Sequence, residues 1–84
     1  MTTSMGVYRA KENLRLRETG SISGKAITTM QAGSLVLILS KGREETIDGI
    51  TDNWVQVETL FGAIDTEEKL IQGEVGWCFS GYLK

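Results

Sequence analysis

The 84-residue chain contains no histidine, no proline and only one cysteine. Without histidine the sequence cannot supply a Ser-His-Asp triad or a Cys-His pair, so Cys78 has no imidazole to activate it as a nucleophile. A single cysteine also excludes an internal disulfide and, in the absence of histidine, the usual ligand set of a zinc site. We therefore expect no enzymatic activity, no cofactor and no bound metal. From its place in the predicted strand after Gly76-Trp77, Cys78 is expected to be a small buried hydrophobic residue.

Long apolar runs are also absent. The longest one, residues 35–39, is far shorter than the ~18 residues that a membrane-spanning helix needs, so no membrane span is expected. Residues 1–6 have neither the basic region nor the apolar region of a secretory signal. A location in the cell envelope or periplasm would therefore require an export signal outside these 84 residues, and the sequence indicates no other compartment.

Net charge is small but unevenly distributed. The formal net charge is −2, yet residues 1–42 carry six basic and two acidic side chains, whereas residues 43–84 carry three basic and nine acidic ones. In a small domain two such halves are expected to interdigitate and to complement one another. The acidic total argues against a nucleic-acid-binding protein, because such proteins hold the phosphate backbone through clustered Lys and Arg side chains.

What the sequence does contain is a series of strand patterns. Residues 13–17 alternate apolar and charged side chains, which directs the two leucines toward a core and Arg15 and Arg17 toward solvent or a partner. Residues 26–30 form a second predicted strand. The aliphatic run 35–39 is typical of a central strand buried on both faces. Ten glycines suit the tight turns that short strands need.

The segment at residues 41–53 is predicted to be a polar loop that Ile47 and Ile50 anchor to the domain. With the strands around it, this loop gives a chain of short strands and turns. The sequence is therefore predicted to form one all-β domain over residues 7–84, a small barrel, after a disordered lead-in at residues 1–6.

Residues 58–73 are compatible with two structures. One is a hairpin whose arms, 59–64 and 69–72, pair across a turn that begins at Asp65. The other is a short helix capped by Asp65, with Glu68 at the capping-box spacing. A helix of this length is marginal without packing, so the hairpin is favoured.

Four short motifs resemble, in order, those of the bacterial SH3 (SH3b) domain family. They are Asn13-Leu14-Arg15-Leu16-Arg17, the stretch from Ile27 to Val36 around Gly33, Asn53-Trp54-Val55-Gln56-Val57, and Gly73-Glu74-Val75-Gly76-Trp77 with Tyr82-Leu83. The resemblance implies an SH3-like barrel of short antiparallel strands with a long hairpin insertion at residues 58–73. Both that insertion and residues 41–53 exceed the minimal form of the family and are placed to border a groove.

Such a resemblance implies non-catalytic recognition. Members of the family often hold cell-wall hydrolases on peptidoglycan or belong to exported proteins, so the implied partner is a cell-wall peptide or an envelope protein. Trp54 and Tyr82 match the Trp and the Tyr that line the peptide groove of the wider SH3 fold. Because Trp54 lies on the opposite face of its strand from Val55 and Val57, its ring is expected either to be exposed for stacking or to cap the core.

Two more residues complete the implied site. Tyr8 joins the groove if the first strand passes beside it, and Glu18 lies in the loop that offers acidic groups to the ligand in eukaryotic SH3 domains. The Ala-Leu-Tyr-Asp-Tyr run of those domains is missing, and Ser80-Gly81-Tyr82 replaces their Pro-Ser-Asn-Tyr. Polyproline recognition is therefore not expected.

A structural role is the alternative from a different class of function. The domain would then assemble with copies of itself through an edge of the 58–73 hairpin, whereas a ligand-binding module is expected to be a monomer. Phe61 would mark an interaction patch if it were exposed at the hairpin. A Phe61 side chain folded back onto the core is favoured.

Overall fold

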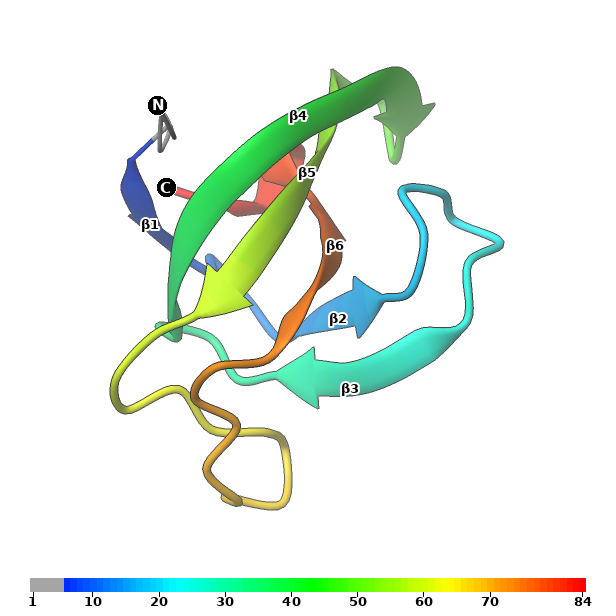
Figure 1. Cartoon of the computed structure of the whole chain (residues 1–84). Coiled ribbons are helices and arrows are strands. Elements are labelled where there is room, and N and C mark those ends of the chain that lie inside the picture. The colour runs from blue at the N-terminus through cyan, green and yellow to red at the C-terminus, as the bar shows by residue number, and fades with distance from the viewer. Residues whose placement is uncertain (1–5) are drawn as a thin grey trace.

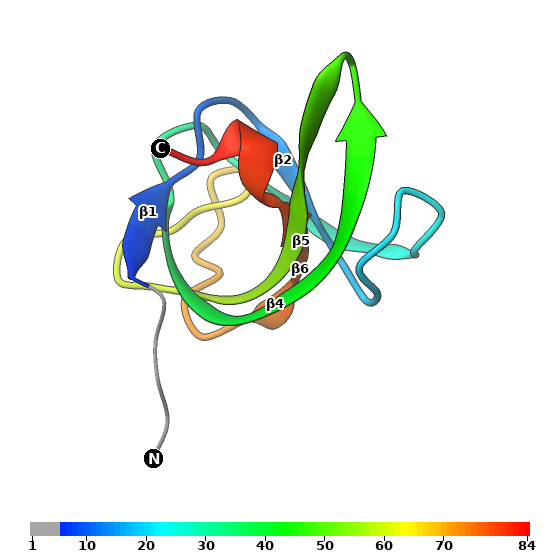
Figure 2. The same ribbon diagram turned by 90° about the horizontal axis from the view of Figure 1, so that it is seen from above.

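The computed structural model describes residues 6–84, which form six antiparallel strands and one short 3-10 helix (Figure 1). The elements are β1 (Val7–Arg9), β2 (Leu14–Arg17), β3 (Ala26–Met30), β4 (Leu35–Ile47), β5 (Ile50–Thr59), β6 (Val75–Phe79) and η1 (Ser80–Tyr82). Hydrogen bonding orders the strands β1-β4-β5-β6-β2-β3. Viewed from above, the sheet curls on itself into a half-barrel (Figure 2). The predicted all-β, SH3-like fold is confirmed.

The core lies on the inner face of the curled sheet, where the alternating side chains of the strands meet. Its buried members are Ala10, Leu14, Leu16, Met30, Val36, Ile38, Val55, Val57, Cys78 and Leu83. The predicted inward direction of the two β2 leucines is confirmed. The prediction that residues 35–39 are buried on both faces is wrong, because Val36 and Ile38 are buried whereas the three leucines between and beside them are half-buried. The outer face of β4 is only partly covered.

The long β4–β5 hairpin replaces the polar loop predicted for residues 41–53, and that prediction is wrong. Ile47 pairs directly with Ile50, and Asp48 and Gly49 form the two-residue connection. Their φ angles of 52° and 76° are both positive, as a type I′ hairpin turn requires. Two irregularities in the register, after Ile38 and after Lys41, bend the hairpin. At its tip, Asp48 lies beside Tyr82 of η1 and accepts a hydrogen bond from its hydroxyl.

The β5–β6 loop, residues 60–74, contains a small irregular hairpin and no helix. The Asp65 N–H donates to the Lys69 carbonyl at 2.9 Å and the Glu68 N–H to the Asp65 carbonyl at 3.0 Å, with a bridge between Ile64 and Leu70. The hairpin interpretation is thus correct, although its arms do not become strands, because β5 continues through Thr59 and pairs with β4. In Figure 1 this loop lies at the opposite end of the molecule from the tip of the β4–β5 hairpin.

The two ends of the domain are held side by side. The Arg9 N–H donates to the Lys84 carbonyl and the Lys84 N–H to the Arg9 carbonyl, both at 2.9 Å. This pairing fixes η1 against the barrel. The lead-in predicted for residues 1–6 lies outside the described residues except for Gly6, whose carbonyl accepts a hydrogen bond from the Ile38 N–H at 3.0 Å. Residues 6–84 contain no helix long and apolar enough to cross a membrane.

Candidate ligand-binding groove

A groove of about 380 Å³ lies on the outer face of the sheet. One wall comes from β2 and from the loop that follows it, the opposite wall from the β4–β5 tip, and one end from η1. The lining residues are Asn13, Leu14, Arg15, Arg17, Ile22, Thr29, Ile47, Trp54, Phe79 and Tyr82. A volume of this size is typical of a site that binds a small molecule or a few residues of a peptide.

Three aromatic rings form the floor of the groove. Trp54 on β5 lies directly opposite Phe79 on β6, with ring centroids 5.8 Å apart and planes tilted by 60°. Tyr82 on η1 meets the edge of Phe79 at 5.5 Å. These offset geometries suit the quadrupoles of the rings and hold them rigidly. Because Trp54 and Phe79 are only 1 % and 2 % exposed whereas Tyr82 is half-buried, the ring surface that a ligand can reach belongs mainly to Tyr82.

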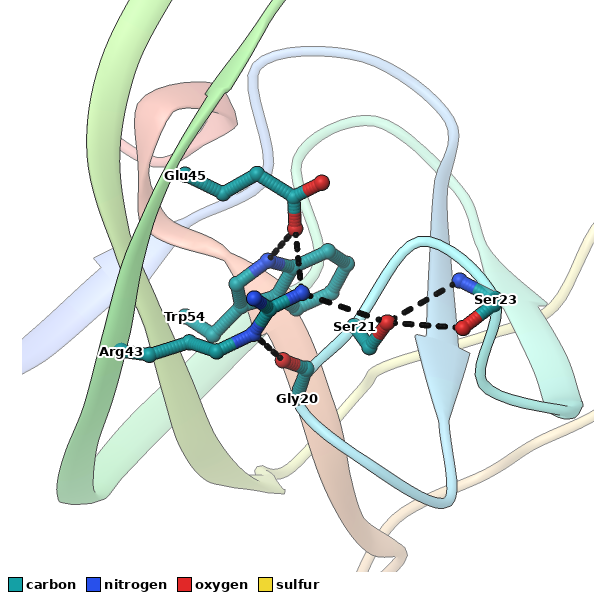
Figure 3. Close-up of polar contacts among 6 residues, drawn as sticks. All are labelled: Gly20, Ser21, Ser23, Arg43, Glu45 and Trp54. Atoms are coloured by element: carbon teal, nitrogen blue, oxygen red, sulfur yellow. Dashed lines mark hydrogen bonds and ion pairs between the residues drawn. The ribbon is translucent and has the colours of Figure 1, made fainter.

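Trp54 is locked under the β4–β5 hairpin. Its indole N–H donates to the Glu45 carboxylate at 2.7 Å, and the same carboxylate accepts from Arg43 at 3.2 Å (Figure 3). Arg43 also donates to the Gly20 carbonyl at 3.2 Å and to the Ser21 hydroxyl at 3.4 Å. These contacts join the β4–β5 hairpin to the β2–β3 loop.

As a result, only 1 % of the Trp54 surface is exposed. The expectation of a ring exposed for stacking is wrong, and the alternative, a ring that caps the core, is correct. Trp54 supports the floor of the groove from below. The prediction of an exposed ring failed because residues 41–53 were expected to form a loop, which would have left the ring uncovered. They form part of the β4–β5 hairpin that covers it.

The second tryptophan, Trp77, is half-buried on the same outer face. Its ring lies between Gly20 and Gly42, where a Cβ atom would come within 3.0 Å and 2.7 Å of ring carbons. A side chain at position 42 would displace the ring, whereas one at position 20 would make a tight contact with it. Trp77 thus packs the base of the hairpin against the β2–β3 loop.

Tyr82 joins the hairpin tip to the end of the groove. Its hydroxyl donates to the Asp48 carboxylate at 2.6 Å. This hydrogen bond, with smaller effects of burial and of the charges on Asp48 and Glu12, raises the pKa of Tyr82 to about 12. Because the hydroxyl proton is committed to Asp48, a ligand meets the face of the ring and the oxygen lone pair.

The other two predicted site residues do not reach the groove. Tyr8 on β1 lines a different hollow, of about 320 Å³, at the mouth of the barrel. Glu18 is exposed and lines neither hollow, while its backbone N–H donates to the Lys25 carbonyl at 2.8 Å. The structure therefore brings together Trp54 and Tyr82 and separates both from Tyr8 and Glu18.

The hollow that holds Tyr8 has an apolar base and a charged rim, to which Lys41 and Asp52 contribute. The pKa of Asp52 is lowered chiefly by the nearby Ser80 hydroxyl and by the Asn53 N–H, with smaller effects of Lys41 and Lys11. The Ser80 hydroxyl nevertheless reaches no partner in standard hydrogen-bonding geometry within the described part of the chain. Asp52 thus stays ionised near neutral pH.

The groove also contains residues that the sequence did not single out for binding. Arg15, Arg17 and Ile22 form its β2 side, and Ile47 forms part of the hairpin side. For the two arginines the alternation in β2 was a usable signal, since it already directed them outward. Nothing in the sequence indicated that the loop residue Ile22 and the hairpin residue Ile47 face each other.

Catalytic and metal chemistry find no support in residues 6–84. No group of three or more His, Cys, Asp or Glu side chains is placed to hold a metal ion there. Cys78 is fully buried, and burial raises the pKa of its thiol to about 12. It is therefore a protonated core residue, as predicted, and not a nucleophile.

Comparison with known proteins gives a single positive result. No curated protein and no solved structure gives a significant match, and no catalytic family matches the chain. The family described as "Bacterial SH3 domain" matches residues 12–84, which is nearly the whole chain. That match includes β2, both tryptophans and η1, so the chain belongs to the bacterial SH3 domain family.

Proposed function

We propose that this protein is a non-catalytic binding module that recognises a cell-wall peptide through the groove on its outer face. The observation that carries the proposal is the preformed groove of about 380 Å³ with its aromatic floor. Bacterial SH3 domains are typically binding modules and usually occur in cell-surface or exported proteins. An envelope location of this protein is part of the proposal, and an envelope protein is the other partner considered.

The shape of the groove favours a short extended chain. Its floor follows three neighbouring elements, β5, β6 and η1, and its walls carry both apolar and polar groups. Such a surface can bury small side chains of a peptide on the rings while the polar walls meet its backbone. The Tyr82–Asp48 hydrogen bond joins the hairpin tip to η1 at one end of the groove.

Sedimentation with insoluble peptidoglycan tests the proposal. Ile22 lines the groove with 51 % of its surface exposed, so Ile22→Ser is expected to leave the fold intact. Loss of its apolar contact should weaken binding about ten-fold, the equivalent of about 1.4 kcal/mol.

Ile27→Ser is the matched control, because Ile27 is 41 % exposed on β3 and does not line the groove. It should bind like the wild type. A wild-type domain that stays in the supernatant, or equal losses in the two variants, would contradict the proposed function.

A structural role has one observation in its favour. Phe61 and Leu70 in the β5–β6 loop are 84 % and 73 % exposed, which contradicts the expectation that Phe61 folds back onto the core. The Ala63 N–H donates to the Leu60 carbonyl at 3.1 Å and Gly62 has a φ of 83°. This turn places Phe61 at an outer corner. Two exposed apolar side chains on one loop are a candidate self-association patch.

The oligomeric state as a function of concentration tests this second function. If the loop mediates assembly, the average mass of the wild type should rise from low micromolar to millimolar concentration, and Phe61→Ser should abolish the rise. Val7→Ser, at another exposed apolar position on β1, is the control and should not change it. A constant monomeric mass would eliminate assembly through this loop and leave the ligand-binding function.

A further inference from the structure

We infer that the groove selects an anionic ligand and that Arg15 and Arg17 bind a carboxylate of the peptide. This inference rests on the proposed function, which it extends by naming the charge of the ligand and the residues that recognise it. The Arg side of the groove lies along β2, opposite the hairpin tip and above the aromatic floor.

The two arginines are placed to act on one group. They are two residues apart on β2, so their side chains leave the same face of the strand with Cα atoms roughly 7 Å apart. Arg17 donates through one guanidinium nitrogen to the Gly24 carbonyl at 2.8 Å, which holds its side chain in place. Arg15 is exposed and makes no side-chain hydrogen bond with any of residues 6–84.

Neither guanidinium group is neutralised by the protein. Within residues 6–84 the ion pairs are Arg43–Glu45 and Lys69–Glu67, so no described carboxylate lies within ion-pair distance of Arg15 or Arg17. The protein as a whole carries a net charge of −2. The presence of two unpaired arginines on one wall of the groove is therefore not explained by a general excess of positive charge on the protein.

The other polar groups along this wall add donors. The Asn13 side-chain oxygen accepts from the Ala32 N–H at 3.0 Å, which leaves the Asn13 amide N–H groups free to donate. The groove lining contains no carboxylate. The acids next to the lining rings are already engaged by the protein: Glu45 accepts from the Trp54 indole N–H at 2.7 Å and is paired with Arg43, and Asp48 accepts from the Tyr82 hydroxyl. Glu12 acts on Tyr82 through its charge alone.

These contacts determine the sign of the ligand. A cationic ligand would face two like charges across a partly desolvated groove, whereas a carboxylate can accept charge-assisted, bidentate hydrogen bonds from a guanidinium group. Glu18, which was expected to attract a basic ligand, does not line the groove. The ligand chemistry that fits is a carboxylate next to a small apolar group, with the carboxylate on the arginines and the apolar group against Tyr82 and Ile22.

A pair of soluble probes tests the inference directly. We suggest N-acetyl-alanyl-alanine with a free carboxylate and the same dipeptide as its C-terminal amide, each titrated against the whole domain by NMR. The acid should shift the resonances of Arg15, Arg17 and the Tyr82 ring, and the amide should shift them at least ten-fold more weakly. Equal shifts with both probes, or no shifts with either, would overturn the inference.

Variants and the cell wall complete the test. Arg15→Gln should weaken binding of the acid about ten-fold and remove the difference between acid and amide. Lys69→Gln, which removes the same charge from the β5–β6 loop, should change neither. Peptidoglycan whose carboxylates have been converted to amides should bind the wild-type domain at least ten-fold more weakly than untreated peptidoglycan does in the sedimentation assay. If both wall preparations bind alike and Ile22→Ser still weakens both, the proposed function stands and this inference fails.

Discussion

Replacement of Trp54 by alanine is expected to lower the free energy of unfolding by about 3–5 kcal/mol, a large part of the stability of a small domain. The ring is one of the largest fully buried side chains of the domain and packs against Phe79. Truncation of a buried Trp to alanine costs about 3–5 kcal/mol, and small domains are stable by only about 5–15 kcal/mol. The change also removes the indole N–H that donates to the Glu45 carboxylate at 2.7 Å. The β4–β5 hairpin then loses one of its contacts with the sheet.

Urea unfolding followed by circular dichroism measures this effect. Trp54→Phe is the graded comparison, because it retains a large ring but loses the indole N–H, and it should cost about 1–3 kcal/mol through the lost charged hydrogen bond and some packing. Trp77→Ala controls for the residue type, since Trp77 is only half-buried and should destabilise the domain less than Trp54→Ala does. A Trp54→Ala midpoint equal to that of the wild type would show that the ring is not a core residue.

This expectation changes how binding by the groove can be studied. A loss of ligand binding in Trp54→Ala would report damage to the fold beneath the groove and not the removal of a ligand contact, because the ring is only 1 % exposed. Exposed residues of the groove walls, such as Ile22 and Arg15, give variants whose folding is expected to be unaffected. Trp54 therefore supports the groove structurally, whereas the residues of the groove walls determine which ligand the groove binds.

The parts of the fold that could be predicted from the sequence are those governed by local patterns. The alternation in β2 fixes which side chains face the core, and the predicted inward direction of Val55 and Val57 is also confirmed. The burial of Cys78 followed from its place in the strand after Gly76-Trp77. In each case the information lies within a few consecutive residues, since the side-chain period of a strand is two.

The β4–β5 hairpin could not be recognised from polarity, because its outer half projects beyond the barrel. Residues 43–46 carry charged and hydroxyl side chains on a strand that does not line the core. The usable signal was the pair Asp48-Gly49 between two isoleucines, since such a pair adopts the positive φ angles of a type I′ turn. The polar composition of residues 41–53 favoured a loop, and the turn-forming Asp48-Gly49 pair was not taken as evidence for a hairpin.

The candidate site depended on this missed element. Whether Trp54 is exposed is decided by the hairpin residue Glu45, which accepts from its indole N–H, and by Arg43, which pairs with that carboxylate. Tyr8 was separated from the groove by strand order, because β1 pairs with β4 on the far side from β2. Such placements are long-range and have no signature in neighbouring residues. The charge of the groove is a partial exception, because the outward arginines of β2 were visible in the sequence.

Rising pH is expected to destabilise the protein from about pH 9 upward, with Cys78 as the main cause. Burial raises the pKa of the thiol from 9.0 to about 12, so the folded state retains a proton that the unfolded chain loses. The stabilisation is fully present below pH 9 and is lost as the pH rises toward 12. At pH 10 the loss is about 1.4 kcal/mol, one pH unit above the pKa in the unfolded chain, and it approaches about 4 kcal/mol at pH 12.

Chemical denaturation between pH 7 and pH 10, at constant ionic strength and with reductant present, measures this loss. Cys78→Val keeps an apolar side chain of similar size and should give a free energy of unfolding that changes little over this range. The absence of histidine makes the comparison clean, since no imidazole titrates near neutral pH. Tyr82 adds a loss in the same direction only above pH 10, because its raised pKa of about 12 replaces an ordinary value of 10.0. Parallel pH profiles for the wild type and Cys78→Val would show that the thiol is not held protonated by burial, and Tyr82→Phe would then isolate the contribution of the hairpin tip.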